Sequence, residues 1–303
     1  MGIFNLLGEY KNKRRKDEAL FGLLLMLPTI IILSLVILYP LAQVLLLSFQ
    51  KANLLTLAQS TFVGLDNFER LIKDPVFWIA LKNTIIFVSC SVVGGLIFGT
   101  ILALLLNEKV PFRNFFRGLA LIPWVVPGVV VALLSLYMFN SQVGIINWVL
   151  VNLGITENLM DWFGSKNNSL WAITIANIWN QIPFYMLMIL AGLQTIPKDE
   201  YEAAAIDGAS SFKKFIHITI PNIRGVLLIV VCLMVIWNFN NFDLAWTTTQ
   251  GGPLNGTMLL SVYVYRNAFV GLDIGYAAAI GLVWLGLLLL FSSIYIKAMK
   301  GEE

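Results

Sequence analysis

The chain has 303 residues, of which 58% are hydrophobic and 12% charged, and its mean hydropathy is +0.81. A composition this apolar excludes an ordinary soluble globular protein. The formal net charge of +3 comes from Lys and Arg outside the apolar runs, so we expect contact with membrane lipid and no nucleic-acid partner.

Six apolar segments are each long enough to cross the hydrocarbon core of a bilayer, which takes roughly 20 residues. They lie near Leu20–Phe49, Ile79–Leu106, Arg117–Phe139, Leu170–Gln194, Arg224–Trp246 and Tyr276–Ile296. The segments are continuously apolar rather than alternating, which excludes a transmembrane barrel and favours helices. We therefore expect an all-α integral membrane protein with six transmembrane helices: a basic segment over residues 1–19, then one membrane domain over residues 20–303.

Lys and Arg are distributed unequally between the two sets of segments that connect the spans. Fourteen fall on one side and five on the other, with Lys82 near a membrane edge. The fourteen are Lys11, Lys13, Arg14, Arg15, Lys16, Lys109, Arg113, Arg117, Lys198, Lys213, Lys214, Arg224, Lys297 and Lys300. Because positive residues concentrate in cytoplasmic loops, we expect both termini and the loop over residues 195–223 to be cytoplasmic.

The fourth and fifth spans carry amide side chains, which are costly in lipid when unpaired. In the fourth span one helical face is formed by Asn177, Asn180, Gln181 and Phe184. In the fifth span the corresponding group is Trp237, Asn238 and Asn241. Gln181 precedes Thr195 by 14 residues and Asn238 follows Arg224 by 14, so both lie about 21 Å from the cytoplasmic ends of their helices. We expect the two faces to meet at one depth.

Amides and aromatic rings together suit a neutral polyhydroxylated ligand, because amides donate and accept hydrogen bonds without charge and rings cover the apolar face of a sugar. The alternative is that these amides hold helices together, a common use of Asn and Gln in membranes. For the whole cluster we favour a water-filled binding site, with the helix-packing role kept for Asn177 or Asn240 singly.

The polar loop between these two spans, residues 195–223, is unusually long for a passive connector. We predict a helix with Pro197 at its first position, a left-handed stop at Gly208, and a second short helix capped by Ser210 or Ser211 and ended by Pro221. Such a hairpin favours a partner outside the chain, although an amphipathic loop that only seals the bilayer surface is the alternative.

Several chemistries lack the residues that they need. No phosphate-binding Gly-x-x-x-x-Gly-Lys-Ser/Thr motif occurs, and the single histidine, His217, has no companions at metal-ligand spacing or in a catalytic triad. Asp243, close to the end of its helix, is the only carboxylate in the spans, which disfavours a proton-driven carrier. We expect no catalytic residue, no metal site and no cofactor in this chain.

The loop resembles the motif of binding-protein-dependent ABC importers, in which Glu-Ala-Ala, three residues, Gly, nine residues and Ile-x-Leu-Pro recur in each membrane subunit. Ile220 replaces the Leu. The resemblance implies the fold of a type I ABC importer permease and a loop that docks on an ATPase subunit. The residues implied in this coupling are Glu202, Ala203, Ala204, Asp207, Gly208, Ile218 and Pro221.

The resemblance extends to the carbohydrate-uptake branch of that family, which includes the maltose, disaccharide and glycerol-3-phosphate permeases. The segments that carry it are Phe62–Phe68, Trp179–Phe184, Asn238–Phe242 and Gly251–Pro253. It implies sugar contacts at Asn180, Gln181, Phe184, Trp237, Asn238 and Asn241.

The implied function is a permease subunit in a prokaryotic inner membrane, importing di- or oligosaccharides. Its implied partners are a second permease, two ATPase subunits that bind ATP and Mg, and an extracytoplasmic sugar-binding protein. A glycerol-phosphate or acidic-oligosaccharide cargo is an alternative, although Asp243 and the lack of pore-facing Arg or Lys disfavour anions. A secondary carrier and a non-transporting membrane anchor are alternatives from other classes.

Overall fold

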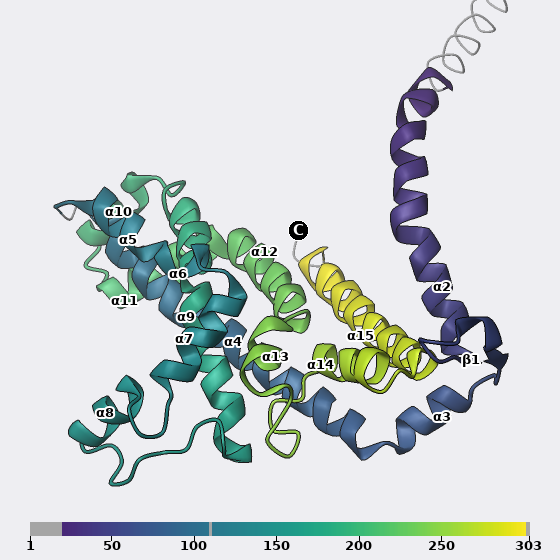
Figure 1. Cartoon of the computed structure of the whole chain (residues 1–303). Helices are drawn as coiled ribbons and strands as arrows, with labels where there is room; N and C mark the ends of the chain where they lie inside the picture. The colour runs from purple at the N-terminus through teal and green to yellow at the C-terminus, as the bar shows by residue number, and fades with distance from the viewer. Residues whose placement is uncertain (1–19, 109–110, 301–303) are drawn as a thin grey trace, which may run out of the picture.

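The computed structural model describes residues 20–108 and 111–300 (Figure 1). The predicted basic segment 1–19 and Lys109 lie outside the described residues. Within the described residues, five helical segments are long and apolar enough to cross a membrane, and a sixth span results if one bent pair is counted as a unit. The prediction of a helical protein with six spans is therefore confirmed, with the bent pair as the third span.

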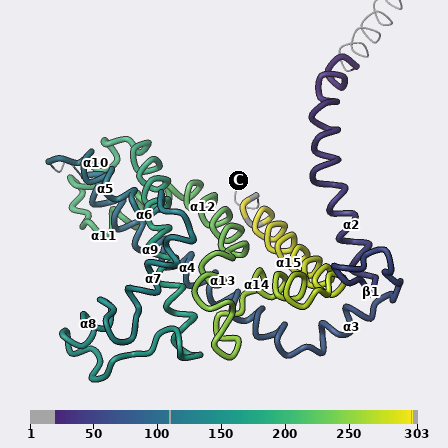
Figure 2. Tube along the Cα trace, viewed as in Figure 1, coloured from purple at the N-terminus to yellow at the C-terminus, as the bar shows by residue number. Residues whose placement is uncertain are grey.

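The first span, Leu20–Ser48, contains a π segment, Ser34–Leu38, and the helix α2, Tyr39–Ser48. It extends away from the other helices in Figures 1 and 2, and the most apolar part of the span has no buried residue. Its lower end contacts α15, Ile274–Lys300. The remaining long helices are α4, Pro75–Asn107; α9, Lys166–Leu193; and α12, Ile220–Phe239.

The third span, expected near Arg117–Phe139, is broken into shorter helices. The chain forms α5, Arg113–Ala120, and α6, Ile122–Val125, and then turns by 93° into α7, Gly128–Met138. Pro127 caps α7 and forces the residue before it into extended conformation, with Val126 at φ −70° and ψ 126°. The third span is therefore a pair of helical segments at a large angle.

The core is built on the contact between α4 and α9. Tyr185 of α9 is fully buried against two glycines of α4. A Cβ at Gly95 would lie 2.2 Å from the Tyr185 ring, and a Cβ at Gly99 would lie 2.3 Å from the Tyr185 Cβ. The Gly95-x-x-x-Gly99 pattern thus allows the close helix approach that small residues permit in membranes.

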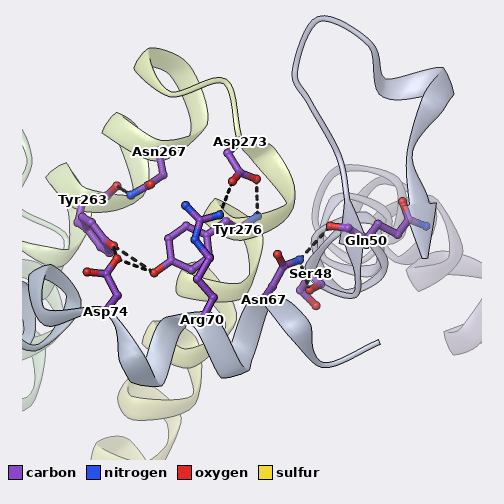
Figure 3. Close-up of polar contacts among 9 residues, drawn as sticks. All are labelled: Ser48, Gln50, Asn67, Arg70, Asp74, Tyr263, Asn267, Asp273 and Tyr276. Atoms are coloured by element: carbon purple, nitrogen blue, oxygen red, sulfur yellow. Dashed lines mark hydrogen bonds and ion pairs between the residues drawn. The ribbon is translucent and has the colours of Figure 1, made fainter. Parts of the chain in front are cut away.

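The loop after the first span departs from pure helix. Its two short strands, β1 (Gln50–Lys51) and β2 (Thr61–Phe62), pair antiparallel, and a 3-10 turn, Leu57–Gln59, separates them. The helix α3, Asp66–Lys73, follows and leads into α4. Asn67 fixes α3 to the end of the first span, because its amide donates to the carbonyls of Ser48 and Gln50, both at 2.9 Å (Figure 3).

A polar cluster fastens α3 and α4 to the C-terminal helices (Figure 3). Arg70 pairs with Asp273 at 2.6 Å and lies 3.9 Å from the ring centre of Tyr276. The carboxylate of Asp74 accepts hydrogen bonds from the hydroxyls of Tyr263 and Tyr276. Tyr263 lies on α14, Leu260–Tyr265, which continues as a π turn, Arg266–Val270, towards α15. These contacts hold the ends of α4, α14 and α15 in one place.

Candidate functional site

The predicted amide faces meet where α9 crosses α12. Gln181 Nε2 donates to Asn238 Oδ1 at 3.1 Å, and Asn238 Nδ2 donates to Gln181 Oε1 at 3.0 Å. Asn177 Nδ2 donates to the same Asn238 oxygen at 2.6 Å and to Ser91 Oγ of α4 at 2.9 Å. The expectation that Gln181 and Asn238 lie at one depth is confirmed.

This network ties three helices together, so part of the cluster has the packing role that was the alternative. Asn177 and Asn238 are 1% exposed, and Gln181 is 7% exposed. Asn238 also donates to the carbonyl of Met234. Buried amides that satisfy each other specify how α4, α9 and α12 pack.

A cavity of about 330 Å³ lies beside this network. Its lining residues are Trp124, Val126, Gly128, Val131, Asn177, Asn180, Gln181, Met234, Trp237, Asn240, Asn241, Phe242, Asp243 and Leu244. Of the six predicted sugar contacts, Asn180, Gln181, Trp237 and Asn241 line the cavity, whereas Asn238 and Phe184 do not. Phe184 lies directly behind the wall, with its ring 5.8 Å from that of Trp124 and 6.0 Å from that of Trp237.

The cavity lies where two spans are interrupted. One interruption is the bend between α6 and α7; the other separates α12 from α13, Asp243–Thr249. Asn180 Nδ2 donates at 2.6 Å to the carbonyl of Pro123, near the first break. Irregular backbone at membrane depth is typical of a cavity that binds cargo, because protein or water satisfies its polar groups there.

Sequence reasoning missed Trp124 as a lining residue and did not include Asn240 or Asp243 among the sugar contacts. Trp124 lies in a strongly apolar run and lines the cavity from α6, directly before the break at Pro127. Asn240 ends α12, so the helical face expected to continue through Asn241 changes direction there. The clustering of Asn, Phe and Asp between Asn238 and Asp243 was the available signal, because such a run does not suit a lipid-facing helix.

The loop between the fourth and fifth spans forms the predicted hairpin. Its first helix is α10, Lys198–Ile206, with Pro197 as the N-cap, one position earlier than expected. Gly208 has φ +75° and ends the helix in the left-handed conformation, as predicted. Ser210 caps α11, Ser211–Lys214, by accepting a hydrogen bond from the backbone N–H of Lys213.

The prediction that Pro221 ends the second helix is wrong. The chain passes from α11 through a π turn, Phe215–Thr219, directly into α12, with Pro221 in its first turn. Pro221 has no N–H to donate, and the wider π turn accommodates it without breaking the helix. The Tyr201 hydroxyl lies 2.9 Å from Thr219 Oγ1 and fastens α10 to this turn.

The hairpin presents a surface that the described residues leave open. Glu202, Ala203, Asp207, Gly208 and Pro221 are exposed, whereas Ala204 and Ile218 are half-buried. Two large apolar side chains also project from it, with Ile206 88% and Phe212 73% exposed. A depression of about 370 Å³ lies alongside, lined by Ala204, Ala209, Lys213, Lys214, His217 and Ile218. Exposed apolar side chains of this size are typical of surfaces that contact a partner protein or a membrane.

Known proteins match this chain along most of its length. The family described as binding-protein-dependent transport system inner membrane component matches residues 95–297. The sulfoquinovosyl glycerol transport system permease protein SmoG of Agrobacterium fabrum is 34% identical, over 94% of this chain and 92% of its own. The trehalose/maltose transport system permease protein MalF of Thermococcus litoralis is 35% identical, over 94% and 96%.

A solved structure shares the fold. It is that of a bacterial alginate ABC transporter in complex with alginate pentasaccharide-bound periplasmic protein, and the similarity covers 94% of both chains. The TM-score is 0.77 at 22% sequence identity, so the similarity concerns the arrangement of helices.

Proposed function

The chain belongs to the family of binding-protein-dependent transport system inner membrane components, and from this premise we propose that it forms half of the translocation pathway of an ATP-driven importer for di- or oligosaccharides. Members of the family are ABC transporter permeases, which are transport components in the prokaryotic inner membrane. The cargo class rests on relatives named for sulfoquinovosyl glycerol and for trehalose and maltose.

The observation that carries the proposal is the cavity at the two interrupted spans. Five amide side chains line it, and so do Trp124 and Trp237. The indole rings suit the apolar face of a pyranose, and the amides suit its hydroxyls. Gln181 belongs to this wall, and its hydrogen bonds with the buried Asn238 hold it in position.

The hairpin of α10 and α11 supplies the second half of the function. We expect it to lie on the cytoplasmic side and to dock on an ATPase subunit, with Glu202 and Asp207 meeting basic groups and Ile206 entering an apolar cleft. Two such ATPases would bind ATP and Mg. A second permease would complete the pathway, and an extracytoplasmic binding protein would deliver the sugar.

Reconstitution of the complete transporter tests this proposal. Proteoliposomes that hold both permeases, the ATPases and the binding protein should accumulate labelled trehalose, maltose or a related oligosaccharide when ATP is present. A non-hydrolysable ATP analogue should abolish accumulation. Uptake that survives without the ATPases would favour a secondary carrier, and no accumulation of any sugar in an assembled complex would favour a membrane anchor.

A further inference from the structure

Asp243 is the one charged side chain among the described residues that line the cavity. No described Lys or Arg accompanies it there. It is the first residue of α13 and is exposed. A single carboxylate in a small cavity sets the sign of the local electrostatic potential, because low-dielectric walls screen it less than bulk water does.

The break between α6 and α7 makes room for this carboxylate. A Cβ on Gly128 would lie 3.0 Å from Asp243 Oδ2 and 3.3 Å from its Cβ. Gly128 is the first residue of α7, and the start of a helix favours a negative charge. Two interrupted spans thus come into contact at Asp243 and Gly128.

Part of the hydrogen-bonding capacity of the cavity is already used within the protein. Each of the five lining amide NH2 groups already donates to a protein acceptor: those of Asn177, Asn180, Gln181, Asn240 and Asn241. The buried Oδ1 of Asn241 has no hydrogen-bond partner within the described chain. The Asp243 carboxylate can only accept. A cargo that donates hydrogen bonds would satisfy the Asp243 carboxylate, whereas the negative charge of an anion would be repelled by it.

We propose that Asp243 is a specificity-determining residue, which makes the cavity select hydroxyl-donating neutral sugars against cargo with a carboxylate, sulfonate or phosphate group. The inference rests on the proposed function and sharpens it. It assigns this chain a cargo of the trehalose and maltose kind, rather than an acidic one such as alginate or the sulfonate-bearing sulfoquinovosyl glycerol for which a relative is named.

A measurement of local charge tests the proposal without knowledge of the cargo. Asn240→Cys places a thiol on the cavity wall, with Cys90 and Cys232 replaced by Ala so that it is the only one in this chain. The assembled transporter in detergent is treated with methanethiosulfonate reagents that carry an ammonium or a sulfonate group. Asp243→Asn should lower the ratio of ammonium to sulfonate reaction rates about tenfold, and Asp243→Glu should keep the ratio.

The matched control is Asp66→Asn, because Asp66 is also the exposed first residue of a short helix and does not line the cavity. It should leave the ratio unchanged. A ratio that Asp243→Asn leaves equal to that of the parent protein would overturn the inference, and would leave the proposed sugar transport standing. A second experiment measures uptake of a neutral and an acidic disaccharide in proteoliposomes. The parent and the variant transporter are supplied by the same binding protein, so the binding protein's own sugar preference is the same in both. Asp243→Asn should raise acidic over neutral uptake severalfold; an unchanged preference would contradict the assignment.

Discussion

Gln181 on α9 and Asn238 on α12 exchange two side-chain hydrogen bonds, at 3.1 and 3.0 Å. Both side chains are buried, and Asn177 joins the pair from one turn earlier on α9. Two amides paired in both directions each use one donor and one acceptor in the same contact. The pair therefore fixes the register of the two helices that bear most of the cavity wall.

The pair should behave as a unit when it is mutated. Asn238→Leu should lower the free energy of unfolding by about 1 kcal/mol, because Gln181 and Asn177 lose their partner in an apolar site. Gln181→Leu should have a similar effect, and the double variant should cost less than the sum. Thermal unfolding of the purified transporter in detergent measures this. Asn240→Leu is the control, since its exposed amide bonds only to Ile236 of its own helix; strictly additive costs would contradict the pairing.

Trp237 should contribute to cargo affinity rather than to stability. It is 53% exposed and lines the cavity, so Trp237→Ala removes a stacking surface without opening the core. We expect the half-saturation concentration for sugar uptake to rise about fivefold to tenfold. Trp148→Ala is the control, because Trp148 is 62% exposed on α8, Ile145–Asn152, and does not line the cavity. Equal effects of the two substitutions would argue against a binding role for Trp237.

Gly208 should matter for coupling through its backbone. Gly208 has φ +75°, and an alanine there would raise the free energy of this backbone conformation by about 1 kcal/mol, although nothing lies within 4 Å of the added Cβ. Gly208→Ala should reduce sugar uptake per ATP hydrolysed, and Gly208→Asn should restore much of it because Asn tolerates the left-handed region. Gly225→Ala is the matched control, since Gly225 is helical with equally open space. Normal coupling in Gly208→Pro would refute the docking role of the hairpin.

The Asp74 cluster should give the protein an acid-sensitive stability. Burial raises the pKa of Asp74, but hydrogen bonds from Tyr263, Tyr276 and two backbone N–H groups outweigh it and hold that pKa below its ordinary value. A carboxyl group whose pKa is lower in the folded state stabilises the protein at a pH above its unfolded-state pKa, about 3.9 for Asp. This stabilisation is lost as the pH falls through the folded-state pKa. Unfolding followed between pH 6 and pH 3 should show a steeper loss in the native protein than in Asp74→Asn. Parallel curves would exclude this contribution.

The sequence was sufficient for much of the fold because bilayer thickness restricts what an apolar run can do. It also placed Gln181 opposite Asn238, since residue counts convert to depth along straight helices. Sequence reasoning failed where the chain changes direction within a span. Hydropathy around Trp124 is the same whether the chain continues straight or turns by 93°, and no local pattern states the angle.

The site was less predictable for a related reason. Asn238 fits the sequence pattern of a sugar contact, but whether it is buried depends on side chains of other helices. Asn177 of α9 donates a hydrogen bond to it and helps to bury it. Pro221 reads as a helix end, yet the π turn before it absorbs the missing donor. In both positions tertiary context decides between two locally reasonable outcomes.

The uninterrupted helical path from Ser211 through the π turn to Phe239 has a mechanical consequence. Asn238 lies about 27 Å from Ile220 along this axis. A partner that displaces α11 would move the far end as one stiff rod, and the amides joined to Gln181 would have to slide or part. Force applied at the hairpin would then act on the hydrogen bonds that join α9 to α12 beside the cavity.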